Sequence, residues 1–250
     1  MRSKLSYEEY DFIGESTLQV IAEANNFNKW MYETIKPYCK SKILEIGSGI
    51  GNISAFFLED KFQILLTDMR PSYCSKLRYR FKGDENFLGT EQINLVDQNF
   101  DSKFKDHFNQ YTTVFALNVI EHIKEDHLAI KNCYKLLKEN GHLIILVPSY
   151  SQLYNNFDKE LGHIKRYNKK SLSRLFSPSQ FEIKERTYFN AIGIFGWYIN
   201  GTLLKKKIIP KQQMGIFNTL VPFFKLIDLI ILRRFGLSTI IIGKKINPPK

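Results

Sequence analysis

The sequence is poor in the residues that build covalent frameworks. Its 250 residues include 3 cysteines, and Cys39, Cys74 and Cys133 lie far apart. An odd, scattered set predicts reduced thiols and argues against a disulfide scaffold or a Cys-x-x-Cys zinc site. The chain also starts without an apolar stretch of the kind that secretory signals carry, since its first residues read MRSKLSYEEYDF. These absences favour a cytoplasmic protein.

Repeats and low-complexity stretches are also missing. Hydrophobic residues make up 44% of the chain and charged residues 24%, which is typical of globular proteins and excludes a disordered or fibrous chain. A chain of this length buries a sizeable core. Histidines and carboxylates nowhere show the spacing of metal ligands, so the sequence predicts no metal site.

The positive charge is concentrated at one end. The net charge is +11, and residues 201–250 contribute +9 of it, with ten basic residues and one acid, Asp228. The first 200 residues are therefore close to neutral, which argues against a surface built for nucleic acid. A segment that is both basic and apolar favours a membrane surface or an anionic partner.

Strand and helix patterns alternate along the first 150 residues, which predicts a parallel, doubly wound α/β sheet. The short strands are apolar without strict alternation, as expected where helices cover both faces. An amphipathic helix is expected before them, at 17–37. The strand candidates are 42–46, 63–66, 92–95, 112–117 and 143–147, and the helix candidates between them are 52–60, 71–79, 101–108 and 125–138.

A glycine-rich turn follows the first strand. It reads EIGSGIGN, with Glu45 ahead of Gly47, Gly49 and Gly51. Glycines at alternate positions allow positive φ angles and close approach of a ligand to the backbone. The spacing departs from the G-x-G-x-x-G of dinucleotide sites, and the carboxylate of Glu45 would repel a pyrophosphate. On charge, the turn favours S-adenosylmethionine, which carries a sulfonium and an ammonium group.

Two further strands end in polar residues. Asp68 ends the second strand about 20 residues beyond the glycines, where a carboxylate can accept hydrogen bonds from both ribose hydroxyls. The fourth strand runs into Asn118, at the edge where open α/β sheets bind ligands.

These motifs, in this order, resemble those of the class I S-adenosylmethionine-dependent methyltransferases. The resemblance implies that Glu45, Gly47, Ser48, Gly49 and Gly51 form the first cofactor motif. It also implies roles for the residues that follow, listed here in chain order: Asp68 for the ribose, Met69 against the adenine, Asn94 and Leu95 at the adenine amino group, and Asn118 near the methionine part. Family members have Asp where this chain has Asn94, and Asp97 is the rival candidate for that contact.

The family resemblance extends to the whole fold. It implies a Rossmann-like, seven-stranded, mostly parallel sheet whose last strand is antiparallel. Here a helical insertion precedes that strand. The expected segments are an N-terminal helical segment (1–41), a cofactor-binding core (42–148), an acceptor loop with a helix at 170–176 and a strand at 181–188 (149–189), a basic apolar insertion (190–235), and the last strand with a tail (236–250).

The loop after the fifth strand carries the candidates for the acceptor side. Its run D-x-x-x-G-H-x-x-R-Y at 158–167 resembles a bacterial subgroup linked with glycan and glycolipid assembly. His163 has the pKa range of a general base for a sugar hydroxyl, and Arg166 can bind a phosphate or carboxylate. Alternatively, Asp158, His163 and Arg166 form a hydrogen-bonded brace of the loop. His122, after the fourth strand, is expected to hold its loop together, with a catalytic base as the alternative.

The insertion at 190–235 is expected to contain helices that lie in a membrane interface. Trp197, Tyr198, Phe223 and Phe224 would insert, and the second half is expected to be broken by Pro222, Lys225 and Asp228. The alternatives are a lid over the acceptor pocket or a dimer contact; the oligomeric state stays open.

The sequence thus predicts an S-adenosylmethionine-dependent methyltransferase, cytoplasmic and peripheral at the inner membrane face. We expect its acceptor to be a hydroxyl of a cell-surface glycan or of a lipid-linked precursor. A nucleic-acid or protein acceptor and a non-catalytic cofactor-binding partner are the alternatives, and nucleic acid ranks low because the charge lies within an apolar segment.

Overall fold

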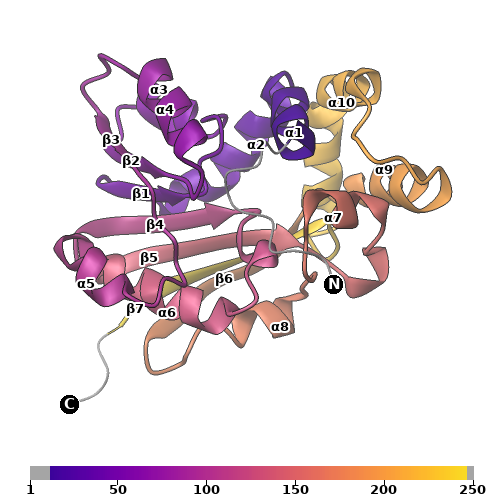
Figure 1. Ribbon diagram of the computed structural model, residues 1–250. Coiled ribbons are helices and arrows are strands. Elements are labelled where there is room, and N and C mark those ends of the chain that lie inside the picture. Colours follow the sequence, from indigo (N-terminus) through magenta and orange to yellow (C-terminus); the bar gives the residue numbers. More distant parts are fainter. Residues whose placement is uncertain (1–11, 247–250) are drawn as a thin grey trace, which may run out of the picture.

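A seven-stranded sheet forms the centre of the computed structural model, which describes residues 12–246 (Figure 1). The strand order is β3-β2-β1-β4-β5-β7-β6, and only β7 runs antiparallel to its neighbours. The expected mostly parallel sheet with an antiparallel last strand is confirmed. The strands are β1 (Ile43–Ile46), β2 (Ile64–Thr67), β3 (Phe87–Glu91), β4 (Tyr111–Leu117), β5 (Leu137–Pro148), β6 (Phe181–Phe189) and β7 (Ser238–Lys245).

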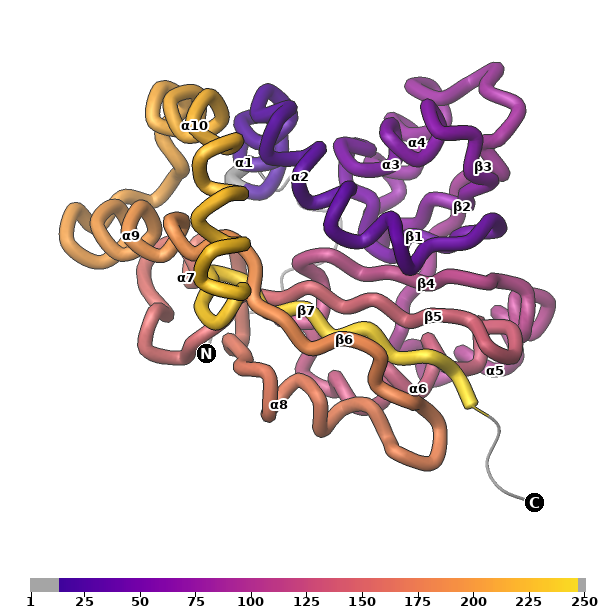
Figure 2. Tube along the Cα trace, turned by 180° about the vertical axis from the view of Figure 1, so that it is seen from behind, coloured from indigo at the N-terminus to yellow at the C-terminus, as the bar shows by residue number. Residues whose placement is uncertain are grey.

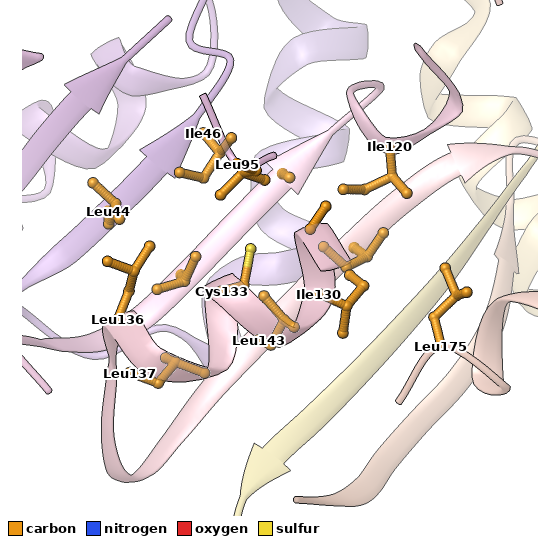
Figure 3. Packing of buried hydrophobic residues seen from close by; sticks show 14 of the residues in the cluster. Leu44, Ile46, Leu95, Ile120, Ile130, Cys133, Leu136, Leu137, Leu143 and Leu175 are labelled. Atoms are coloured by element: carbon orange, nitrogen blue, oxygen red, sulfur yellow. The ribbon is translucent and has the colours of Figure 1, made fainter. Parts of the chain in front are cut away.

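Helices cover both faces of this sheet, as the apolar strands require. One buried cluster joins β1, β4 and β5 to α5 and α6, and Figure 3 shows part of it. A second cluster on the other face joins the sheet to α2, α3, α4 and α10. The helices are α1 (Phe12–Ala22), α2 (Asn25–Ile35), α3 (Ser54–Glu59), α4 (Pro71–Arg80), α5 (Phe100–Lys103), α6 (Asp126–Leu136), α7 (Asn156–Leu161), α8 (Lys169–Ser173), α9 (Gly193–Trp197) and α10 (Lys211–Ile230).

Short helical turns complete the connections. The 3₁₀ turns are η1 (Lys36–Tyr38), η2 (Lys105–His107), η3 (Ile120–His122) and η4 (Ser151–Leu153), and the π-helical turn η5 (Tyr198–Leu203) continues α9. All three cysteines are buried and free, in line with the expected reduced thiols. Residues 1–11 and 247–250, which belong to the expected N-terminal segment and tail, lie outside the described residues.

Two expectations about the first half were wrong. The single N-terminal helix at 17–37 is two helices, α1 and α2, separated at Glu23 and Ala24. The third strand lies at 87–91 and not at 92–95. That strand pairs only with β2 and is half-exposed, so it lacks an apolar run. The apolar Ile93 and Leu95 that suggested a strand are buried from the loop after it.

The insertion at 190–235 also differs from expectation, because its second half is one continuous helix, α10. Pro222 lies inside this helix and lacks the N–H that would bond the carbonyl of Asn218. The side-chain amide of Asn26 donates to that carbonyl at 3.1 Å instead. In return, Asn218 Oδ1 accepts the N–H of Phe27, near the start of α2, at 3.0 Å. Both orphan backbone groups are therefore satisfied between the two helices.

Buried contacts fix α10 against the domain. Val221 is buried, and Phe217 and Phe224 pack against the same core cluster. Asp228 is buried at the end of the helix and accepts the N–H groups of Asn190 and Ala191 at 2.7 and 2.9 Å. Figure 2 shows α10 standing beside α1 and α2, with α9 next to α7. The insertion therefore lies at the edge of the molecule that holds α1 and the loop before α7.

Candidate active site

The glycine turn after β1 adopts a conformation that side chains disfavour. Gly47, Gly49 and Gly51 all have left-handed φ angles, of 71°, 56° and 83°. A Cβ on Gly47 would lie 2.4 Å from Val119 Cγ2, and one on Gly51 would lie 2.6 Å from the ring of Phe81. The neighbouring side chains thus pack closely against this turn, which requires glycine at Gly47 and Gly51, and the expected close approach of the backbone to a ligand stays a prediction.

Hydrogen bonds tie the ends of β1 and β2 together. The N–H of Ser48 donates to Thr67 O at 2.8 Å, and the N–H of Gly49 donates to Asp68 Oδ2 at 3.1 Å. Asp68 is 7% exposed, and its Oδ1 accepts the N–H of Arg70 at 2.9 Å. Asp68 thus stands beside the glycines, as a ribose-binding carboxylate requires, with further lone pairs on both oxygens.

A cavity of about 290 Å³ lies next to these loops. Met69 and Asn94, both expected at the adenine, line it together with Gln92 and Asp97. Asn94 Oδ1 accepts the N–H of Val96 at 3.0 Å, while the carboxylate of Asp97 pairs with Lys103 at 2.5 Å. Asp97 is thus committed to a lysine, which favours Asn94 for the adenine contact.

Two of the expected cofactor residues face elsewhere. Leu95 is buried in the core beside Ile46, as Figure 3 shows, and its carbonyl accepts the amide of Asn132 at 2.8 Å. Glu45 is 4% exposed and accepts a hydrogen bond from Ser54, in the first turn of α3, at 2.5 Å. Its carboxyl group therefore points to α3, and the expected role of Glu45 in cofactor binding stays a prediction.

Burial raises the pKa of Glu45 to about 7. Between its ordinary pKa of about 4.5 and 7, the folded protein holds a proton that the unfolded chain has lost, so stability falls as pH rises through this window. Replacing Glu45 by Gln removes this pH dependence of the stability. We expect the wild type to lose stability relative to Glu45→Gln between pH 5 and pH 8 in urea unfolding. Glu59→Gln, an exposed control, should track the wild type; an equal slope for both variants would contradict the assignment.

The N-terminal helices close over the glycine turn. Leu18 of α1 lies 3.1 Å from the position a Cβ on Gly49 would take, and the amide of Asn52 donates to Leu18 O at 3.1 Å. Lys76 of α4 pairs with Glu15 of α1 at 2.5 Å. A cofactor in the turn would thus lie beneath α1.

Asn118 ends β4 at the same edge of the sheet. It has a left-handed φ of 55°, which Asn tolerates better than most side chains, and it is exposed. Its N–H donates to Leu146 O at 2.8 Å, which holds the turn against β5. The next residue, Val119, touches the glycine turn, so Asn118 lies where the methionine part of the cofactor was expected.

Asp158, His163 and Arg166 meet in a buried network. Asp158 Oδ1 accepts from His163 Nδ1 and from Arg166 Nε, both at 2.7 Å. Burial opposes ionisation of Asp158, yet these two hydrogen bonds keep its pKa below the ordinary value. Asp158 Oδ2 accepts the N–H of Asn155, which completes the cap of α7. This favours the brace alternative for Asp158.

Arg166 has the same structural role. Its side chain is fully buried, its NH1 donates to Ser149 O at 2.8 Å, and its guanidinium lies 4.8 Å from the ring centre of Trp197. The guanidinium is enclosed by the protein and its NH2 group has no hydrogen-bond partner among the described residues, so the contact with a phosphate or carboxylate of an acceptor stays a prediction. Trp197, expected to insert into a membrane, packs here on Arg166 and Phe157.

His163 keeps one nitrogen directed away from this network. Its Nε2 lies 3.9 Å from Glu121 Oε1, and its ring meets that of the exposed His122 edge-on, with the centroids 4.8 Å apart. His122 Nδ1 lies 3.3 Å from Gly162 O, so it links the two loops as expected. The base proposal for His163 stays a prediction.

Two residues at this edge were missed by the sequence reasoning. Glu121 is fully buried, and burial raises its pKa to about 8. Tyr150, just after β5, has a left-handed φ of 61° and stacks on Tyr188 with centroids 5.1 Å apart. Such strain is typical of functional loops. The adjacent "EH" letters signalled Glu121 weakly, whereas nothing in the sequence signals the conformation of Tyr150.

A larger cavity, of about 650 Å³, lies away from these loops, around Asn109, Tyr134 and Lys245. Lys245 is buried there, and its ammonium donates to Asn109 Oδ1, Tyr134 O and Leu137 O at 2.7–3.0 Å. Its donors are already satisfied by the protein, so this cavity does not compete with the glycine turn as the cofactor site.

Comparisons with known proteins agree with this site. Residues 44–143 match the family model described as a methyltransferase domain. A probable polyketide synthase (42) of Dictyostelium discoideum is 28% identical over 152 residues, which is 52% of this chain and 6% of that protein. The chain thus spans a small part of the curated relatives that it matches.

Solved structures share the fold. The geranyl diphosphate C-methyltransferase of Streptomyces coelicolor has a TM-score of 0.61 at 11% identity, covering 98% of this chain and 89% of that one. A SAM-dependent methyltransferase of Archaeoglobus fulgidus has a TM-score of 0.55 at 15% identity, covering 87% and 94%.

The strand order and the solved structures show the fold of class I S-adenosylmethionine-dependent methyltransferases, and residues 44–143 match a methyltransferase domain. When bound, the cofactor supplies a methyl group on a sulfonium. The residues fit it, since the glycine turn, Asp68 and the cavity with Met69 adjoin one another. The loops after β4 and β5 then stand where an acceptor would be aligned with the methyl group.

Proposed function

We propose that this protein is an S-adenosylmethionine-dependent methyltransferase that acts on a hydroxyl of a glycan or of its lipid-linked precursor, at an anionic membrane surface. The observation that carries the proposal is the outer face of α10. Helix α10 has the length and apolar composition of a membrane-spanning segment, and 11% of its 18-residue window is buried. Because its other face packs on α2 and the core, we infer that α10 lies in the membrane interface rather than across it.

The outer face of α10 is a continuous apolar stripe. Apolar residues recur every three or four positions, which places them on one side of the helix. Phe223 is 65% exposed and Ile230 71%, whereas Val221 on the inner side is 1% exposed. The exposed members of the stripe are Ile216, Leu220, Phe223, Leu226 and Ile230. An apolar surface of this kind marks an interaction site.

Positive charges stand beyond both ends of the stripe. Lys205–Lys207 precede α10, and Arg233 and Arg234 follow it. On the helix itself, Lys211 and Lys225 pair with Glu23 and Glu33, which leaves the outer face apolar. An apolar stripe between basic residues suits acyl chains below anionic head groups. Phe224, expected to insert, packs inward, so Phe223 is the aromatic residue of α10 available to the membrane.

The insertion adjoins the acceptor side of the site. The amide of Asn155 donates to Trp197 O and Thr202 Oγ1 at 3.2 and 3.3 Å, and Asn155 also caps the helix that carries Asp158. A lipid-linked acceptor held at the membrane would therefore reach the loop of His163 without leaving the interface.

A carbon acceptor is the second candidate. It is favoured by two of the solved structures with this fold, a carbon methyltransferase and a geranyl diphosphate C-methyltransferase. Those proteins share little sequence identity with this chain, so their acceptors are weak support. We rank a hydroxyl acceptor first because of the exposed apolar stripe on α10.

Methyl transfer and membrane binding are tested in one experiment. The protein is incubated with methyl-labelled S-adenosylmethionine and fractionated lipid-linked glycan, thioester, RNA and protein pools, with phosphatidylglycerol vesicles present. We expect the label in the lipid-linked glycan pool, on an oxygen, with vesicle-bound protein. Label in the thioester pool on carbon would support the second candidate, and label in RNA or protein would overturn the proposal.

A pair of variants isolates the stripe. Full burial of one large apolar side chain contributes about 1.5–3 kcal/mol. The double variant Leu220→Ser, Phe223→Ser should therefore bind vesicles at least about tenfold more weakly. Tyr79→Ser, which removes a side chain 87% exposed on α4, is the matched control and should bind as the wild type does. Equal vesicle binding by all three proteins would contradict the proposed membrane binding through the stripe.

A further inference from the structure

Three side chains with metal-binding atoms meet between two loops. Glu121 and His122 belong to η3, and His163 follows α7. One ligand atom from each lies within 4.8 Å of the others. The loops are held in register by the N–H of Ile164, which donates to Glu121 O at 2.8 Å. His163 lies about 40 positions after Glu121 and His122 in the sequence, so the three side chains come together only in the folded chain.

Glu121 supplies an observation that points to a ligand. It is fully buried, and neither carboxylate oxygen has a hydrogen-bond partner among the described residues. A buried carboxylate without a donor is costly, so such groups are paired or coordinate a metal. Arg166 favours the charged form of Glu121 from a distance, but its hydrogen bonds go to Asp158 and Ser149.

His163 presents a matching lone pair. Asp158 accepts from Nδ1, which assigns the hydrogen of the neutral ring to Nδ1 and leaves Nε2 as an acceptor. Nε2 lies 3.9 Å from Glu121 Oε1, which is too far for a direct hydrogen bond between them. A carboxylate that orients a histidine through its other nitrogen is the usual support of a metal-bound imidazole.

We propose that Glu121, His122 and His163 bind a divalent transition metal ion, with Zn²⁺ as the best-suited ion. Two imidazoles and one carboxylate are zinc ligands, and three protein ligands leave a fourth position open, as in catalytic zinc sites. Ligand atoms about 2.0–2.1 Å from a tetrahedral ion stand about 3.3 Å apart. The ligand atoms, which lie within 4.8 Å of one another, would therefore have to approach by up to about 1.5 Å to bind the ion.

The ion has a defined task, which rests on the proposed hydroxyl acceptor. The loop that follows β4 leads from Val119, which contacts the glycine turn, directly to Glu121 and His122. A hydroxyl oxygen in the open position would lose its proton to water, because a bound divalent ion lowers the pKa of an oxygen ligand. The oxygen–carbon bond then forms as the sulfur–carbon bond breaks, and the sulfonium leaves as a neutral thioether.

Calorimetric titration of the untagged full chain with ZnCl₂ tests the site without any acceptor. We expect one equivalent to bind, and Co²⁺ in its place to give the absorption of a tetrahedral site. Glu121→Gln and His163→Gln should each weaken binding by more than the about 10–100-fold that the loss of an outer partner costs. His127→Gln, on an exposed histidine of α6, is the control and should bind as the wild type does.

Each outcome decides the proposal. A wild type that binds no Zn²⁺, or variants of Glu121 and His163 that bind it equally well, would show that the pair shares a proton and no metal. Circular dichroism confirms that each variant is folded before it is scored. Because binding is read without methyl transfer, a protein that binds zinc but methylates carbon would overturn the proposed hydroxyl acceptor and leave the metal site standing.

Discussion

Replacing Asp158 by Ala is expected to lower the free energy of unfolding by about 3–5 kcal/mol, the usual cost of leaving a buried charge without its partner. Asp158 is fully buried and accepts hydrogen bonds from His163, Arg166 and the backbone of Asn155. Without it, the guanidinium of Arg166 stays enclosed with one partner fewer, and the cap of α7 is lost. Urea unfolding monitored by circular dichroism measures the change.

A surface pair provides the comparison for this prediction. Asp101 forms a hydrogen-bonded ion pair with Lys135, and its side chain is 68% exposed. Asp101→Ala should cost at most about 1 kcal/mol, as exposed pairs do. Asp158→Asn keeps an acceptor for Asn155 and should lie between the two. If Asp158→Ala were no more destabilising than Asp101→Ala, the buried network would not be what holds this loop.

The second large effect is expected at Gly47, on cofactor binding. In Gly47→Ala, the new methyl group would meet Val119 Cγ2 at 2.4 Å, and the residue would keep a left-handed φ of 71°. Such backbone conformations cost about 1–3 kcal/mol for a residue with a side chain. The turn must shift to relieve this strain, so we expect S-adenosylmethionine to bind at least about tenfold more weakly by calorimetry.

The variant Gly83→Ala tests whether the loss of cofactor affinity depends on the position of Gly47 or follows from backbone strain at any glycine. Gly83 also has a positive φ, of 92°, but no heavy atom lies within 4 Å of the Cβ that Ala would add. This variant should lose stability and keep the affinity of the wild type. Adding Val119→Ala to Gly47→Ala removes the colliding methyl group and should restore part of the affinity. A Gly47→Ala protein that binds the cofactor normally would remove the turn from the site.

The sequence predicted the sheet because local signals and tertiary demands agree there. The apolar strands β1, β4 and β5 are buried on both faces, and the glycines that end β1 need the φ angles that only glycine adopts easily. The edge strand β3 was misplaced because its own residues are half-exposed, while the apolar residues lie in the loop beyond it.

The acceptor side was less predictable, because its geometry depends on contacts between distant segments. The sequence pattern around Asp158, His163 and Arg166 predicted a functional loop. Whether Arg166 faces an acceptor or the core depends on Trp197, some 30 residues away. The pairing of Glu121 with His163 likewise depends on how the loops after β4 and β5 meet. Spacing along the chain contains no record of such contacts.

The proline of α10 makes the contact between α10 and α2 directional. Pro222 leaves the carbonyl of Asn218 without its intrahelical donor, Asn26 of α2 donates to that carbonyl, and the side chain of Asn218 accepts the N–H of Phe27. The backbone of α10 thus presents a free acceptor in the middle of the helix, and α2 presents the matching donor. The insertion is therefore attached to the N-terminal helices by polar contacts of fixed direction, and its placement does not depend on apolar packing alone.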